Sequence, residues 1–302
     1  MPSDFEAQVR ARNDKINAQV RATNDAINKR TGRPLLRAIL VGIALGGALI
    51  VSLVIFKALF MVFAGLLIGF TTVELANALR SAGRNVPRIP TLVAALAVVP
   101  AAFLLGSGGH WLATLAGIAL ISIWRLIEFA ASRERPTGRE LLLDLGAGVL
   151  ILVYVAFMAG FAVLLTAQDG GQWWTLAFLI VVVSVDIGAY ASGLAFGKHK
   201  MAPTISPGKT WEGFAGSAVV AVLAGVLLAI LMLQQSWWVG VVLGLTMVAT
   251  ATVGDLAESL IKRDLGIKDI STWLPGHGGF LDRVDSSLLS AAAAYALFLI
   301  FT

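Results

Sequence analysis

Cysteine is absent from the 302-residue chain, and charged residues make up only 14% of it. Without cysteine there is no thiolate nucleophile and no thiolate metal ligand. Apolar residues make up 58% and the mean hydropathy is +0.83, whereas a soluble domain carries about 25% charged residues. This composition excludes a soluble, disordered, collagen-like or disulfide-stapled protein. We therefore predict an all-α polytopic membrane protein.

Nine apolar segments approach or exceed the roughly 20 residues that a membrane-spanning helix requires. They are Ala38–Phe56, Ala58–Leu79, Ile89–Gly106, Trp111–Ala131, Leu141–Ala167, Trp173–Phe196, Phe214–Leu233, Trp237–Gly254 and Val284–Phe301. Residues 35–302 are therefore expected to form one transmembrane domain of about nine helices.

The basic residues lie on one side of this predicted topology. Of the 23 Lys and Arg residues, only Lys57 falls in a connection on the opposite side. Because basic residues mark the cytoplasmic side, we expect a cytoplasmic N-terminus and a location in the cell's inner (plasma) membrane. The net charge of +5 is then an orientation signal, and nucleic-acid binding has no support.

Residues 1–34 form a polar tail that is expected to lie in the cytoplasm. Within it, Ala7–Asn17 is followed by the similar Ala18–Asn28, so the tail repeats with a period of 11 residues. Such a period fits a helix of about 3.67 residues per turn. Both a surface or self-associating helix and a plain polar extension are compatible with this pattern.

Acidic residues indicate where the chemistry takes place, because a carboxylate at membrane depth is costly and usually faces a cavity. Only Asp169 falls in a predicted outer loop. The outer half of the predicted transmembrane domain therefore has almost no acidic residues, and we expect a polar cavity that faces the cytoplasm. Asp186 lies inside the sixth segment with no basic residue within a helical turn, which favours a functional role.

Three further acids near the inner ends of segments have simpler interpretations. Glu74 and Glu128 are expected to be interfacial charges, since side chains at helix ends reach water cheaply. Asp144 is expected to form a structural ion pair with Arg139 or Arg125.

Residues 254–287 are dense in both charges and include Asp255, Asp282 and Asp285. Asp255 ends the eighth segment and the other two acids bracket the start of the ninth. Carboxylates that converge from two helix ends would bind Mg²⁺, which takes oxygen ligands and retains waters for phosphates. The sequence therefore predicts a divalent-metal site here.

A glycine-rich turn, residues 275–279, lies between these acids. Its backbone N–H groups, notably those of Gly278 and Gly279, could approach phosphate oxygens closely. The turn also contains His277, which in this setting favours loop geometry or a phosphate contact over a general base. The neighbouring basic and hydroxyl-bearing residues are Ser259, Lys262, Arg263 and Arg283.

A second polar segment, residues 197–213, contains Ser206, Lys209 and Thr210. It is not a P-loop, because Pro203 stands where that motif needs glycine and no strand is predicted before it. The segment is interpreted as a basic loop that could bind anionic phosphate or a lipid headgroup. A loop that only sets orientation remains the alternative.

The run from Ser259 to Asp285 resembles the signature of the phosphatidate cytidylyltransferases, also called CDP-diacylglycerol synthases. That pattern, S-x-x-K-R-x₄-K-D-x₅-P-G-H-G-G-x-x-D-R-x-D, is matched throughout. The segments 184–190 and 205–213 are also similar to that family. They differ at Ile187, where the family commonly has Thr or Ser, and at Gly208, where it has Lys. The resemblance covers about residues 31–302.

The resemblance implies transfer of CMP from CTP to phosphatidic acid, giving CDP-diacylglycerol and pyrophosphate for phospholipid biosynthesis. It implies Mg²⁺ and leaves open a second cation such as K⁺. By resemblance, Asp255, Asp282 and Asp285 hold the metal, with the last two also catalytic, and Lys262 and Arg263 neutralise phosphate charge. It also implies a homodimer in contact with membrane lipid.

Three other functions stay open. An archaeol cytidylyltransferase or a polyprenol kinase would use a nucleoside triphosphate on another lipid. A transporter could use Asp186 and Asp144 for ions, although the bare outer half and the lack of an evident inverted repeat argue against it.

Overall fold

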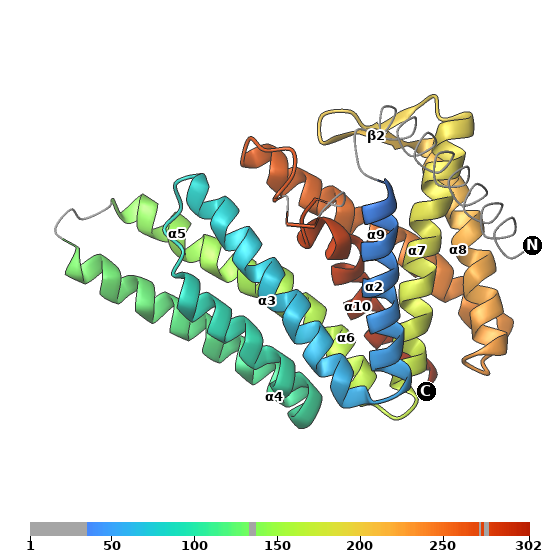
Figure 1. Ribbon diagram of the computed structural model, residues 1–302, viewed down its shortest axis with the longest axis horizontal. Helices are drawn as coiled ribbons and strands as arrows, with labels where there is room; N and C mark the ends of the chain where they lie inside the picture. The colour runs from blue at the N-terminus through green and yellow to red at the C-terminus, as the bar shows by residue number, and fades with distance from the viewer. Residues whose placement is uncertain (1–34, 133–136, 272, 275–277) are drawn as a thin grey trace, which may run out of the picture.

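The described part of the chain folds mostly into helices (Figure 1). The computed structural model describes residues 35–132, 137–271, 273–274 and 278–302, so the repeat within residues 1–34 lies outside the described residues. The helices are α2 (Leu35–Val54), α3 (Lys57–Ser81), α4 (Arg88–Ala131), α5 (Gly138–Ile151), α6 (Met158–Ala167), α7 (Gly171–Phe196), α8 (Trp211–Leu231), α9 (Trp237–Asp264) and α10 (Leu281–Phe301). A π-helical turn, Leu152–Phe157, joins α5 to α6.

Within the described residues, seven helical stretches are long and apolar enough to cross a membrane, with α5 to α6 as one stretch. This confirms the prediction of an all-helical membrane protein. Among these seven stretches, α4 is one element although two spans were predicted in it, and α2 is not included. The predicted number of nine spans therefore stays a prediction.

Helix α4 reverses its direction at Gly106. This glycine has φ 66° and ψ −155°, a backbone conformation that is essentially restricted to glycine. Ala94 and Gly117 would lie about 35 Å apart in a straight helix. Instead, a Cβ atom added to Gly117 would be 3.0 Å from that of Ala94. The predicted segments Ile89–Gly106 and Trp111–Ala131 therefore occupy two halves that pack against each other.

Small residues allow α8 and α9 to pack backbone against backbone. A Cβ atom added to Gly225 would collide with the carbonyl oxygen of Gly240, and one added to Gly244 would be 2.7 Å from Cα of Val222. Many large apolar side chains on the outside of the helices are exposed, for example Leu231. Such a surface suits the hydrocarbon of a bilayer.

The segment between α7 and α8 forms a β-hairpin, in contrast to the predicted loop. Strand β1 (Lys200–Ala202) pairs antiparallel with β2 (Ser206–Thr210). Pro203 and Pro207 disfavour a helix here because proline lacks an N–H donor. The side chain of Thr210 then accepts a hydrogen bond of 3.1 Å from the backbone N–H of Gly213 and caps α8.

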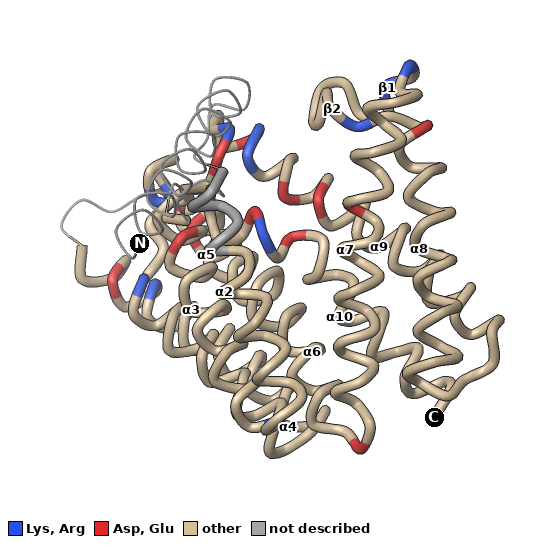
Figure 2. Tube along the Cα trace, turned by 45° about the vertical axis from the view of Figure 1, so that its right-hand side comes forward, with Lys and Arg blue, Asp and Glu red and all other residues tan. Residues whose placement is uncertain are grey.

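Charge is segregated along the helices. Figure 2 shows that the described Lys, Arg, Asp and Glu residues gather at the end that carries the hairpin, while the opposite end is almost free of them. The polar chemistry of the molecule is therefore concentrated at one end of the helices.

Candidate active site

A polar cavity of about 230 Å³ lies between the C-terminal part of α9 and the first turns of α10. We call it the acidic cavity. It is lined by Asp255, Glu258, Lys262, Asp269, Asp282, Arg283 and Asp285. The three carboxylates predicted to converge, Asp255, Asp282 and Asp285, thus share one cavity wall.

Gly254 sets the approach of the two helices at this cavity. A Cβ atom added to Gly254 would lie 2.5 Å from the backbone oxygen of Asp285 and 3.3 Å from Cα of Ser286. Because Gly254 has no side chain, α9 can contact the backbone of α10, and the next residue, Asp255, is placed beside Asp285.

We expect Gly254→Ala to separate the two helices, to destabilise the protein by about 1–3 kcal/mol through overpacking and to lower activity. Gly146→Ala is the matched control, because a Cβ atom at exposed Gly146 meets nothing within 4 Å. Thermal unfolding and turnover of both variants check this. Wild-type values for Gly254→Ala would show that the close approach is not needed.

Lys262 links two carboxylates inside the acidic cavity. Its Nζ atom lies 2.5 Å from Oε2 of Glu258 and 3.0 Å from Oδ1 of Asp282. Glu258 is only 1% exposed, and it was not among the predicted site residues. Its position four residues before Lys262 on the same helix face was the available signal.

A second cavity, of about 250 Å³, borders the first through Asp255. We call it the mixed cavity, because polar and apolar side chains from α7, α8, α9 and the hairpin line it. Lys209 lies in it, with Nζ 2.8 Å from Oδ2 of Asp255. Asp186 and Thr210 also line it, so a carboxylate from within α7 reaches the cavity region, as its position in the sixth segment predicted.

The other predicted binding residues lie close to these cavities without lining either of them. The hydroxyl of Ser259 donates to Oδ1 of Asp255 at 3.4 Å. The Nε atom of Arg263 donates to the backbone oxygen of Ile205 at 3.2 Å, which ties α9 to the hairpin. Ser206 begins β2. The substrate contacts predicted for these residues stay predictions.

Two carboxylates accept hydrogen bonds from the backbone N–H groups of residues 279–281, where the glycine-rich turn leads into α10. The N–H of Gly279 donates to Oδ2 of Asp282 at 2.7 Å, and the N–H groups of Phe280 and Leu281 donate to the carboxylate of Glu74 at 3.1 and 2.8 Å. A phosphate would have to compete with these carboxylates for the same donors. Gly278 has φ +81°, which favours glycine, whereas His277 lies outside the described residues.

Glu74 is the residue that sequence reasoning placed wrongly. We expected an interfacial charge, but its side chain is 1% exposed and also accepts a hydrogen bond from Ser271. It lies on α3 and satisfies N–H groups at the start of α10, which have no partner within their own helix. No local pattern in the sequence connects two residues more than 200 positions apart.

Asp144 forms the structural ion pair expected of it, with Arg125 as its partner. Oδ2 of Asp144 lies 2.7 Å from Nη2 of Arg125, and both side chains are buried. Oδ1 accepts from the backbone N–H of Asn85 at 2.8 Å. Glu128 lies 3.8 Å from Arg125 and is only partly exposed. Neither acid lines the acidic or the mixed cavity.

The donor atoms of the acidic cavity suit Mg²⁺ in kind, because carboxylates supply the oxygen ligands that this ion prefers. As placed, no group of three Asp, Glu or His side chains in the described part of the chain could hold a metal ion. Instead, the ammonium groups of Lys262 and Lys209 neutralise Asp282 and Asp255.

Comparison with known proteins places this chain among cytidylyltransferases. The chain is 39% identical over 272 residues to the phosphatidate cytidylyltransferase of Mycobacterium bovis, covering 88% of this chain and 89% of the relative. It is 38% identical to that of Mycobacterium leprae, covering 89% and 88%, and 37% identical to that of Brucella suis, covering 65% and 86%. Residues 36–301 match the family model described as the cytidylyltransferase family. The chain therefore belongs to the cytidylyltransferase family.

Proposed function

We propose that this chain is a phosphatidate cytidylyltransferase, which transfers CMP from CTP to phosphatidic acid and yields CDP-diacylglycerol and pyrophosphate. The observation that carries this proposal is the acidic cavity, where five carboxylates, Lys262 and Arg283 lie next to apolar helices at the charged end of the molecule. The names of the relatives support the same activity.

The reaction needs no nucleophile from the protein. A phosphate oxygen of phosphatidic acid attacks the α-phosphorus of CTP, and the bond from that phosphorus to the bridging oxygen of pyrophosphate breaks. The protein must bring two anions together and stabilise the charge on the leaving pyrophosphate. Lys262, Lys209 and Arg283 supply positive charge at the two adjoining cavities.

We also propose that Asp255, Asp282 and Asp285 hold Mg²⁺ once the substrate arrives, with room left for a second cation such as K⁺. When bound, such an ion neutralises negative charge on the phosphates. The lysines that neutralise the carboxylates would then turn toward phosphate oxygens.

The choice of acceptor lipid separates this proposal from its nearest rivals. Purified protein with labelled CTP is offered phosphatidic acid, archaeol phosphate or polyprenol, and chloroform-soluble label is counted. We expect label on phosphatidic acid. Because a kinase transfers the γ-phosphoryl group, label on polyprenol from γ-labelled CTP alone would indicate a kinase, and ion flux into proteoliposomes without CTP would indicate a transporter.

We further propose nine spans, a cytoplasmic N-terminus and insertion in the inner membrane, with the acidic cavity on the cytoplasmic side. This rests on the one-sided distribution of Lys and Arg. The homodimer implied by the resemblance is part of the same proposal.

Because the chain has no cysteine, single cysteines can report this topology without background. Cysteines at Gly108 and Gln234 are expected to react with an impermeant thiol reagent from outside the cell, and those at Arg84 and His199 only after permeabilisation. Labelling at His199 from outside would contradict the nine-span arrangement and the cytoplasmic site.

A further inference from the structure

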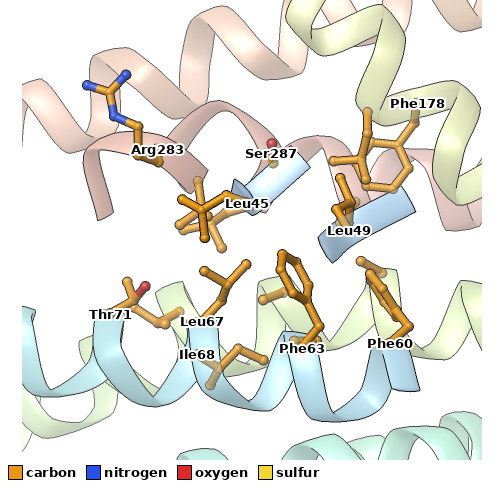
Figure 3. A pocket seen from close by; sticks show the side chains of 18 of the residues that line it. Leu45, Leu49, Phe60, Phe63, Leu67, Ile68, Thr71, Phe178, Arg283 and Ser287 are labelled. Carbon is orange, nitrogen blue, oxygen red and sulfur yellow. The ribbon is translucent and has the colours of Figure 1, made fainter. Parts of the chain in front are cut away.

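An apolar groove of about 270 Å³ runs between α2, α3, α6, α7 and α10 (Figure 3). Leucine, phenylalanine and other apolar side chains make up almost all of its wall, and the polar residues that line it are Thr71, Arg283 and Ser287. A buried groove of this kind binds hydrocarbon well, because each buried methylene group is favourable by about 0.8 kcal/mol.

The groove has a polar end and an apolar end. Figure 3 shows Arg283 and Thr71 at one end and Phe60 and Phe178 at the other. Phe60 and Thr71 both lie on α3, about 16 Å apart along the helix axis. One leaflet of the hydrocarbon core is about 15 Å thick, so the groove is as long as one acyl chain in a membrane leaflet.

Arg283 connects the groove to the acidic cavity, because its side chain lines both. It is exposed, and within the described residues no hydrogen bond or ion pair engages its guanidinium. A guanidinium with five free N–H donors suits a phosphate group, which it can bind through two parallel hydrogen bonds.

We propose that this groove holds one acyl chain of phosphatidic acid, with the lipid phosphate on Arg283 at the entrance to the acidic cavity. The inference rests on the proposed function and adds a structural basis for acyl-chain length selection. Phe60 and Phe178 close the far end and limit the chain length.

A hydrocarbon chain fits this groove better than a peptide segment does. A peptide would bring backbone N–H and C=O groups that need hydrogen-bond partners, and leaving each of them unpaired is costly. The wall offers few polar partners, all of them near the Arg283 end or along the adjoining turn of α10. An acyl chain needs none, while its phosphate meets the guanidinium of Arg283.

Gly46 of α2 provides a direct test, because it lines the groove and a Cβ atom added there meets nothing within 4 Å. The Cβ atom itself is accommodated, and longer side chains at this position are expected to extend into the groove. Gly47 is the matched control: its Cβ atom also meets nothing within 4 Å, it is exposed, and it does not line the groove.

The experiment compares dioleoyl with dihexanoyl phosphatidic acid as substrate for Gly46→Ala, Gly46→Leu and Gly46→Phe and the same series at Gly47. The ratio of kcat/KM for the long over the short lipid is expected to fall stepwise with side-chain size at Gly46. For Gly46→Phe we expect this ratio to fall about tenfold, which is the effect of excluding about two methylene groups of the acyl chain from the groove. At Gly47 the ratio stays at the wild-type value.

An unchanged ratio throughout the Gly46 series, or an equal loss with both lipids, would overturn the inference. If Gly46→Phe does not fold, the ratios of Gly46→Leu and Gly46→Ala decide in the same way. These results differ from failure of the proposed function, in which the wild-type protein transfers no label to either lipid.

Discussion

Lys262→Met is expected to lose both stability and activity, and a second substitution is expected to restore only the stability. Glu258 is 1% exposed and its carboxylate lies 2.5 Å from Nζ of Lys262. Removing the ammonium leaves a buried charge without its partner, which costs about 3–5 kcal/mol. Removing positive charge next to the phosphates lowers turnover by at least about a hundredfold.

The double variant Glu258→Gln, Lys262→Met separates these two effects. It no longer leaves Glu258 as a buried charge without a partner, so its unfolding temperature in detergent is expected to rise part of the way toward that of the wild type, although Asp282 still lacks its ammonium partner. Its cytidylyl transfer is expected to stay low, because the charge that faces Asp282 is still missing. Recovery of activity together with stability would mean that Lys262 only supports the fold.

Glu74→Gln is expected to reduce turnover by at least about tenfold while the protein stays folded. The carboxylate of Glu74 accepts hydrogen bonds from Ser271 and from the N–H groups of Phe280 and Leu281, immediately before Asp282. The amide of glutamine has only one acceptor oxygen, and its NH₂ group would face backbone N–H donors. Leaving these groups without acceptors costs about 1–3 kcal/mol. Glu74 is therefore a positioning residue for the first turn of α10.

The readout must distinguish positioning from general stability. Displacement of Asp282 is expected to lower kcat and to raise the Mg²⁺ concentration that gives half-maximal rate, with little change in KM for CTP. Glu128→Gln is the control, because Glu128 is also an acid near the end of a predicted span but contacts Arg125 and Trp124, away from the cavities. Wild-type kcat and Mg²⁺ dependence for Glu74→Gln would refute the positioning role.

Much of the fold could be predicted because hydropathy is a local property. Each apolar segment of the sequence is helical over most of its length in the structure, and the glycine at 106 marks the reversal within α4. The β-hairpin between α7 and α8 was missed, because two short strands leave too little alternation of polar and apolar residues to be recognised.

The site could be predicted only in part, for a similar reason. Asp282 and Asp285 lie in the first turns of α10, and Asp255 lies in α9, the preceding helix, so their position in one cavity was visible in the sequence. The prediction that Asp255 ends its helix was wrong, because α9 continues through polar residues to Asp264. The contact of Glu74 with α10 depends on the packing of helices far apart in sequence. Arg263 follows Lys262 directly in the chain. Because neighbouring residues of a helix point in different directions, the side chain of Arg263 contacts Ile205 in the hairpin and does not enter the acidic cavity.

The most direct test of the account is the position of the transferred phosphorus and its dependence on Mg²⁺. Purified protein stripped with a chelator is given phosphatidic acid and CTP labelled either at the α- or at the γ-phosphate, and Mg²⁺ is then restored. We predict chloroform-soluble label from α-labelled CTP only, formed in equal amount with pyrophosphate and only after Mg²⁺ is added. Lipid label from γ-labelled CTP, or undiminished transfer without any divalent cation, would contradict it.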